Sequence, residues 1–284
     1  MDKKKWFLYS IYTVVLATFF VYYLFPTERL KKFVIAQVGR VNPALRVTVE
    51  KAGLMLPPGV RLQQVQVDHD NTPLLLADDL AILPHLKTLL SDRKRYSFRM
   101  KTDEGEVTGK AEIDGTRQVT IDAVAAGLEL GGLPFLKHLS ANHVEGILDG
   151  KFAYVAASGK PEVLNINLDI NNMAVTLGTP FFTLDQVRFD KVHADAVLRN
   201  QRLEITRVTL TGDQIEGNLA GSAALNTDLM QSIVNLNGTV MPQKQFLENS
   251  GVQVSGSILA GLKAGGGIPI RISGPLGDLQ LVTR

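Results

Sequence analysis

The sequence contains no cysteine among its 284 residues. A disulfide framework, a zinc–thiolate site and a cysteine nucleophile are therefore excluded. An excess of one charge is also absent, since 30 basic and 28 acidic residues leave a formal net charge of +2. Such a chain offers no broad basic surface to nucleic acid, and its basic cluster Arg93-Lys94-Arg95 is typical of a solvated segment. We expect no nucleic-acid partner.

Signatures of catalysis are lacking as well. The chain has no Gly-x-Ser-x-Gly elbow, no Walker-type loop and no dinucleotide fingerprint. His69 stands between Asp68 and Asp70, but a metal site needs three or four converging ligands, and carboxylates beside turns are usually solvated. We therefore predict a protein that is not an enzyme, with no catalytic, cofactor-binding or metal-binding residues.

One long apolar run stands near the N-terminus. The 20 residues from Trp6 to Phe25 carry no charge and follow Lys3-Lys4-Lys5. As a helix, this run spans ~30 Å, the thickness of a bilayer's hydrocarbon core. It is longer than the core of a secretory signal peptide, and Tyr22 and Tyr23 at its end suit an interfacial aromatic belt. The predicted anchor residues are Trp6, Phe7, Leu8, Ile11, Val14, Val15, Leu16, Phe19, Phe20, Val21, Leu24 and Phe25.

This run divides the chain into two parts. Residues 1–26 are predicted to form a cytoplasmic tail and a single transmembrane anchor in the bacterial inner membrane. Residues 27–284 are predicted to form one β-rich domain. Basic residues flank the run on both sides, so the positive-inside count does not decide the orientation. Because the short tail cannot fold, the domain is the working part, and we place it in the periplasm.

A short helix is predicted directly after the anchor. Thr27 can cap it, Glu28 suits its positive end, and Gly39 can end it. Leu30 and Val34 fall near one face together with Phe33 and Val38. This face allows two interpretations, a plug for the open end of the β body or a helix on anionic lipid headgroups.

The rest of the domain alternates apolar and polar residues with a period of two. In the segment 164–171 every even position is apolar and every odd position polar, which is typical of an antiparallel sheet with solvent on one side. The same pattern recurs around 45–49, 65–67, 203–205, 219–225, 234–240 and 268–272. We predict a mainly β fold, a curved and mostly antiparallel sheet with a few short helices. The residues proposed to line an apolar groove are Leu164, Ile166, Leu168 and Ile170; a closed core is the alternative.

Two segments depart from this period. Asp79–Arg93 has leucines at helical spacing, and Leu133–Leu139 is a shorter version, so both are predicted to be helical. Gly-x-x-x-Gly elements occur at 105–109, 146–150 and 217–221. Because they are embedded in strand pattern, they are predicted to mark bends or bulges.

The chain resembles a known family in the order of these elements. The anchor, the Leu54-Met-Leu-Pro-Pro-Gly59 turn, the leucine-rich segment before Ser91-Asp92-Arg93-Lys94 and the Gly105–Gly109 element resemble type II secretion system protein N. The segments that resemble AsmA-like periplasmic proteins are Leu128–Leu136, Gly146–Gly150, Leu210–Gly217 and Ile268–Gly274. The resemblance implies an inner-membrane protein whose periplasmic β body forms a half-open trough and serves the type II secretion machinery. AsmA-like relatives are linked to lipid handling.

Two function hypotheses follow. In the first, the protein is a non-catalytic accessory component of the type II secretion system. Its β domain docks on other secretion subunits through strand edges or through the solvent-exposed face of the sheet. In the second, the apolar face holds or transfers lipid acyl chains. Either hypothesis requires a cover for the apolar face, which is supplied by the protein's own helices, a partner or lipid.

Overall fold

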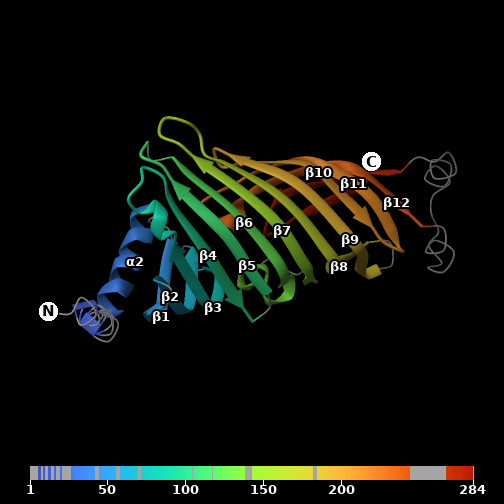
Figure 1. Ribbon diagram of the computed structural model, residues 1–284. Helices are drawn as coiled ribbons and strands as arrows, with labels where there is room; N and C mark the ends of the chain where they lie inside the picture. Colours follow the sequence, from blue (N-terminus) through green and yellow to red (C-terminus); the bar gives the residue numbers. More distant parts are fainter. Residues whose placement is uncertain are drawn as a thin grey trace, which may run out of the picture.

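The computed structural model describes residues 27–41, 45–55, 58–69, 72–103, 105–116, 118–137, 143–181, 184–243 and 267–283, with isolated residues between 6 and 20. Its body is one antiparallel sheet of 14 strands, paired in the order of the sequence (Figure 1). The first seven strands are β1 (Leu45–Met55), β2 (Gly59–His69), β3 (Thr72–Pro84), β4 (Lys94–Thr102), β5 (Gly105–Ile113), β6 (Val119–Glu129) and β7 (Val144–Ala156). The other seven are β8 (Val163–Phe181), β9 (Leu184–Arg199), β10 (Arg202–Thr211), β11 (Ile215–Ala224), β12 (Ile233–Pro242), β13 (Ile268–Pro275) and β14 (Gln280–Thr283).

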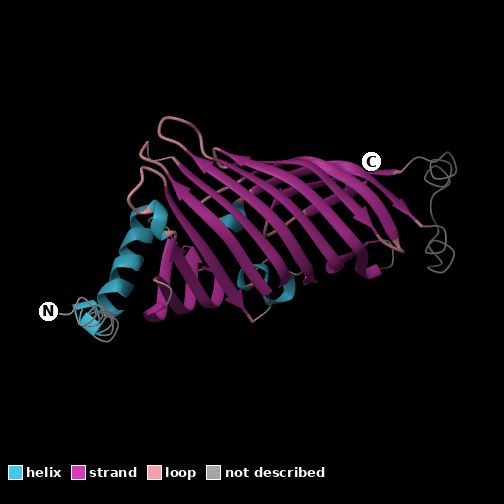
Figure 2. Ribbon diagram, in the orientation of Figure 1, coloured by secondary structure: helices cyan, strands magenta, loops and turns pink. Residues whose placement is uncertain are grey.

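Helices are few and short, as Figure 2 shows. Those whose bounds lie within the described part of the chain are α2 (Thr27–Val41), α3 (Pro134–Lys137) and the 3₁₀ turns η1 (Leu86–Thr88), η2 (Leu130–Gly132) and η3 (Leu229–Gln231), and the isolated residues described between 6 and 20 are also helical. The prediction of a mainly β fold with one large antiparallel sheet is therefore confirmed.

The sheet is a meander because the period-two segments lie in consecutive strands. Each strand pairs with its sequence neighbours, and the segment 164–171 lies in β8 between β7 and β9. The sheet curves, and its C-terminal strands pass behind β7–β9 in the view of Figure 1. This curvature brings Val187 of β9 into one cluster with Ile268 and Ile270 of β13.

The predicted helix over Asp79–Arg93 is wrong. Asp79 to Pro84 complete β3, and the only helical turn that follows is η1. Leu80 pairs with Leu62 of β2 and Met100 of β4, so the ladder on both sides of β3 overrides the local helical spacing. The two other helices are confirmed: α2 begins at Thr27 and ends two residues after Gly39, and α3 lies inside Leu133–Leu139.

One glycine element shows why the sequence needs glycine there. Gly146 has φ +144° and lies at a register shift between Glu145 and Ile147 in the β7–β8 ladder. A Cβ on Gly146 would lie 3.0 Å from Ile170 Cγ2. The bulge predicted for this element is confirmed.

No helix of the described residues is long and apolar enough to cross a membrane. Most of the predicted anchor lies outside the described residues. Of its members, Trp6, Phe7, Leu16 and Phe20 are described, and all are helical and exposed. The predicted transmembrane helix is not shown.

Candidate functional site

The two faces of the sheet differ sharply in chemistry. We call the side that carries Leu164, Ile166, Leu168 and Ile170 the apolar face, and the opposite side the polar face. Paired residues of antiparallel strands point to the same face. The row through Ile166 is Phe98, Gly109, Ala123, Phe152, Ile166 and Ala196. The row through Leu168 is Met100, Val107, Ala125, Gly150, Leu168 and Ala194. Neither row contains a charged side chain.

The apolar face is closed at both ends of the sheet. At the N-terminal end, Val34 of α2 packs on the buried cluster of Val49, Leu62, Val65 and Ala77. Lys31 Nζ donates a hydrogen bond to the Glu50 carbonyl at 3.4 Å, which fixes α2 along β1. The helix therefore covers core, as the plug interpretation requires.

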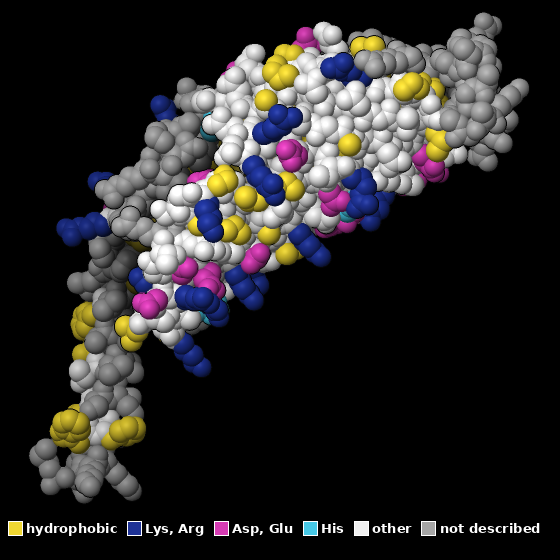
Figure 3. Space-filling view, turned by 90° about the horizontal axis from the view of Figure 1, so that it is seen from above, with side chains coloured by type: hydrophobic (Ala, Val, Ile, Leu, Met, Phe, Trp, Pro, Cys, Tyr) yellow, Lys and Arg dark blue, Asp and Glu magenta, His cyan; other side chains and the backbone are white. Residues whose placement is uncertain are grey.

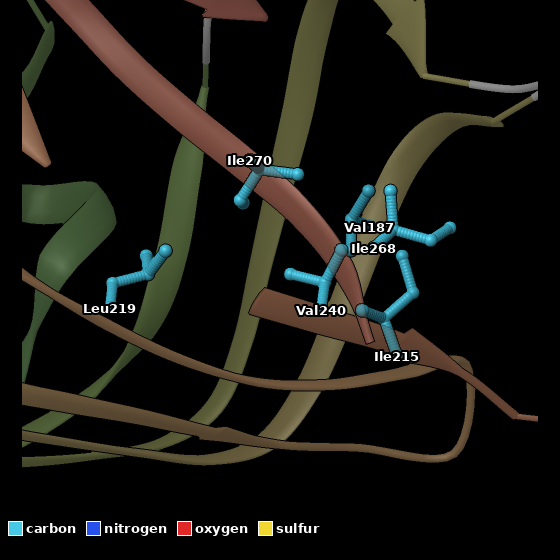
Figure 4. Packing of buried hydrophobic residues seen from close by; sticks show 6 residues of the cluster. All are labelled: Val187, Ile215, Leu219, Val240, Ile268 and Ile270. Atoms are coloured by element: carbon cyan, nitrogen blue, oxygen red, sulfur yellow. The ribbon is translucent and has the colours of Figure 1, made fainter. Parts of the chain in front are cut away.

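At the C-terminal end the cover is the sheet itself. Its cluster is drawn in Figure 4 and consists of Val187, Ile215, Leu219, Val240, Ile268 and Ile270. All six side chains are at most 7% exposed. Because they come from β9 and β11–β13, the closure follows from the curvature of the sheet.

The centre of the apolar face is less covered than its ends. Among the described residues of β4–β8, the buried ones are Ala125, Leu128 and Gly150. The four predicted lining residues of β8 are all half-buried, as are Phe98 and Phe152 in the neighbouring strands. Large aliphatic and aromatic side chains thus stay in partial contact with solvent, an arrangement that costs hydrophobic free energy unless something covers them.

The phenol of Tyr154, on the apolar face, has a raised pKa. Tyr154 pairs with Leu164 of β8 and Ile121 of β6. Burial raises the pKa of the Tyr154 phenol to about 12, and its hydrogen bond to the Glu162 carboxylate adds to the rise. The hydroxyl therefore remains protonated across the physiological pH range.

A groove of about 1080 Å³ crosses the sheet from β3 to β10, with Met55 of β1 at one end. On β3 it is lined by Ala81 and Leu83 but not by Ile82 between them. Ala81 pairs with Arg99 and Leu83 with Ser97, so these side chains point away from the apolar face. The groove therefore opens on the polar face.

The groove combines aliphatic and charged side chains. Its aliphatic members on the polar face include Leu83, Val124, Ala153 and Val197, and its charged members are Arg99, Lys110, Asp122, Lys151 and Asp195. Val124 is 46% exposed. Figure 3 shows a face of the body where hydrophobic side chains lie between Lys and Arg side chains. Such a mixed surface suits a polypeptide segment better than a small molecule.

Ion pairs order the polar face beside this groove. His193 of β9 lies 3.0 Å from Asp169 Oδ1 and 3.2 Å from Asp195 Oδ2. The hydrogen bond from Arg207, at 2.6 Å, lowers the pKa of Asp195, and Asn167 contributes further. Hydrogen bonds from His193 and then Lys191 lower the pKa of Asp169. These contacts tie β8, β9 and β10 together.

Only part of the segment weighed above as a metal site, Asp68-His69-Asp70, lies in the described residues. Asp68 accepts a hydrogen bond from Gln66, and Asp70 lies outside the described residues. Elsewhere on the sheet, His143 Nε2 lies 3.4 Å from Glu145 Oε1. Over the residues that the structure describes, no group of three or more His, Asp or Glu side chains could hold a metal ion.

No family model, curated protein or solved structure matches this chain. The features that bear on function are the two faces of the sheet and the sequence elements described above.

Sequence reasoning found the apolar face but missed the groove. Of the four lining residues predicted on β8, Ile166 borders the groove, although its side chain belongs to the opposite face by register. Alternation tells which side chains point outward. The alternation pattern does not predict a groove on the polar face, because the groove arises from the twist and curvature of several strands.

Proposed function

We propose that this protein is a non-catalytic accessory component of the type II secretion system, anchored in the bacterial inner membrane with its β domain in the periplasm. The assignment to this machine follows from the resemblance of its sequence elements, and the AsmA-like trough is part of the same proposal. The domain acts by docking on other secretion subunits through the polar-face groove.

The groove is the observation that carries the docking proposal. It crosses eight strands, β3–β10, which at ~4.8 Å between strands gives a length of about 34 Å. An extended segment of ~10 residues fits this length at ~3.3 Å per residue. The aliphatic residues offer apolar contact, and the basic and acidic residues set register and orientation.

The free edges of the sheet give a second contact surface. Among the described strands, the four-residue β14 pairs with β13 alone, and its Leu281 and Val282 are 44% and 48% exposed. An unpaired edge accepts a strand from a partner by main-chain hydrogen bonds.

Site-specific photo-cross-linking tests the docking proposal. A photoreactive amino acid replaces Val124 in the groove, and a matched variant replaces Met241, which is 42% exposed and does not line this groove. In cells with an intact type II secretion system, we expect adducts with identified secretion subunits from position 124 and none from position 241. Equal adducts from both positions, or none from either, contradict the proposal.

A second candidate function is the holding of lipid acyl chains, which the half-buried centre of the apolar face favours. The rows through Ile166 and Leu168 offer methyl, methylene and ring carbons and no charged partner. An acyl chain would cover them without leaving a polar group unsatisfied, whereas a peptide backbone would need hydrogen-bond partners.

Lipid analysis of the detergent-purified full chain tests this second function. Ile166→Asp with Leu168→Asp places two charges on the central face. We expect near-stoichiometric acyl species from the wild type and their loss from the double variant. Because these aspartates could unfold the sheet, the milder Ile166→Ser with Leu168→Ser accompanies them, with circular dichroism as a check. A wild-type extract free of lipid rules the function out.

A further inference from the structure

The connection between β3 and β4 carries an unusual exposed surface. Its leucines Leu86, Leu89 and Leu90 are 55%, 38% and 101% exposed. No residue of the described part of the chain thus covers Leu90. Four basic residues, Lys87, Arg93, Lys94 and Arg95, share the segment with one acidic residue, Asp92. We call residues 86–95 the leucine loop.

The leucine loop holds its leucines outward by satisfying its own backbone. Thr88 N donates to the His85 carbonyl at 2.8 Å, and Thr88 Oγ1 donates to the same oxygen. Ser91 Oγ lies within hydrogen-bond distance of two carbonyl oxygens, those of Thr88 at 2.8 Å and Arg93 at 2.6 Å, and its single hydroxyl hydrogen can serve either one. Arg95 N donates to Thr88 Oγ1 at 3.1 Å.

Thr88 is half-buried and Ser91 is exposed, and both side chains bond to the backbone of the turn itself. The leucines take no part in these hydrogen bonds and remain exposed. An ordered loop loses little conformational entropy when a surface covers it.

The cations stand next to these leucines. Arg95 Nε is 2.8 Å from Glu112 Oε2, and Arg93 Nε is 4.0 Å from Glu112 Oε1. One carboxylate therefore neutralises part of the basic charge. Lys87 and Lys94 are both exposed and add to the basic charge of the leucine loop.

We infer that the leucine loop is a membrane-contact element, whose leucines enter the interface of an anionic bilayer while Lys87 and Lys94 meet lipid headgroups. An apolar tip beside basic side chains matches the layering of such a bilayer, where headgroup charge lies above hydrocarbon. A protein partner is a poorer fit, because leucine is under-represented among the residues that dominate protein–protein binding and the loop exposes no aromatic side chain. The inference does not depend on the secretion assignment.

The absence of cysteine allows a direct test with the full-length chain. Leu90→Cys receives an environment-sensitive fluorophore, and the protein is reconstituted into vesicles of phosphatidylcholine with or without phosphatidylglycerol. Asp213→Cys is the control, since it is exposed in the β10–β11 connection at the opposite end of the strands. Lipids with a quencher on the acyl chain report depth.

We expect a blue shift and quenching of the label at position 90 in phosphatidylglycerol vesicles, and neither at position 213. Lys87→Gln with Lys94→Gln should weaken the contact, by about fivefold for each lost cation. Leu90 is fully exposed among the described residues, so its replacement leaves the fold intact. Equal signals from both positions overturn the inference. A blue shift without quenching by the lipid-borne probe also overturns it, because protein then covers the loop.

Discussion

Two isoleucines of the apolar face allow a matched test of its uncovered centre. Ile268 is 4% exposed and packs with Val187 and Val240 in the C-terminal cluster. Ile166 points to the same face but is half-buried in the central β8. Truncation of each isoleucine to alanine removes the same atoms from a β-strand. The difference between the two losses in free energy of unfolding therefore measures how much more deeply Ile268 is buried than Ile166.

The magnitudes follow from burial. For Ile268→Ala, we expect a loss of about 2–5 kcal/mol in the free energy of unfolding, because the variant loses transfer free energy and leaves a cavity. For Ile166→Ala, we expect ~1–2 kcal/mol, since part of its side chain already contacts solvent and the space left opens to solvent.

Urea unfolding of the full chain, followed by far-ultraviolet circular dichroism in one non-ionic detergent, measures both losses. The midpoint should fall further for Ile268→Ala than for Ile166→Ala, with unchanged slope. Leu219→Ala and Leu168→Ala form a second pair, because Leu219 is 7% exposed and Leu168 half-buried. Equal losses within both pairs would refute the idea that the centre of the apolar face is uncovered.

Three further predictions concern stability. Gly146→Ala should lower the unfolding free energy by about 1–3 kcal/mol, because φ +144° strains any side chain; thermal unfolding measures it, and an unchanged midpoint contradicts it. The pKa values of Asp169 and Asp195 are lowered in the folded state, so their ion pairs stabilise the fold above the usual carboxyl pKa, and this stability is lost as pH falls through the folded-state values. Asp169→Asn and Asp195→Asn should therefore have a lower free energy of unfolding than the wild type at pH 7 and approach the wild-type value in acid. A difference in unfolding free energy that stays constant across pH refutes this. Val34→Asp should expose α2 to limited proteolysis while β8 stays protected, and uniform protection of both would show that Val34 does not fasten the helix.

Much of the fold could be predicted from the sequence because a strand pattern is local. Period-two alternation in 164–171 placed β8 correctly, and it also assigned its apolar side. The segment Asp79–Arg93 shows where local reasoning fails. Its leucines fit a helix, but Leu80 gains cross-strand partners on both sides of β3, and these long-range contacts decide the structure.

The candidate site was less predictable than the fold. Burial at Val187 and Ile268 depends on a curvature that brings β9 to β13, and no short segment of sequence encodes that approach. The polar-face groove likewise arises from the combined shape of eight strands. The exposed Leu90 could not be recognised either, because the leucine spacing predicted a helix through this segment.

Native mass spectrometry of the full chain, released in mild detergent from its own membranes, tests the central claim most directly. The claim is that the β domain functions by binding a secretion subunit or lipid, and that this ligand remains bound when the protein is isolated. The docking proposal predicts the 31.0 kDa chain together with the added mass of an identified secretion subunit, and the lipid proposal predicts an increment of one or a few acyl lipids. The bare chain mass alone, from membranes that contain an active secretion system, would contradict the account.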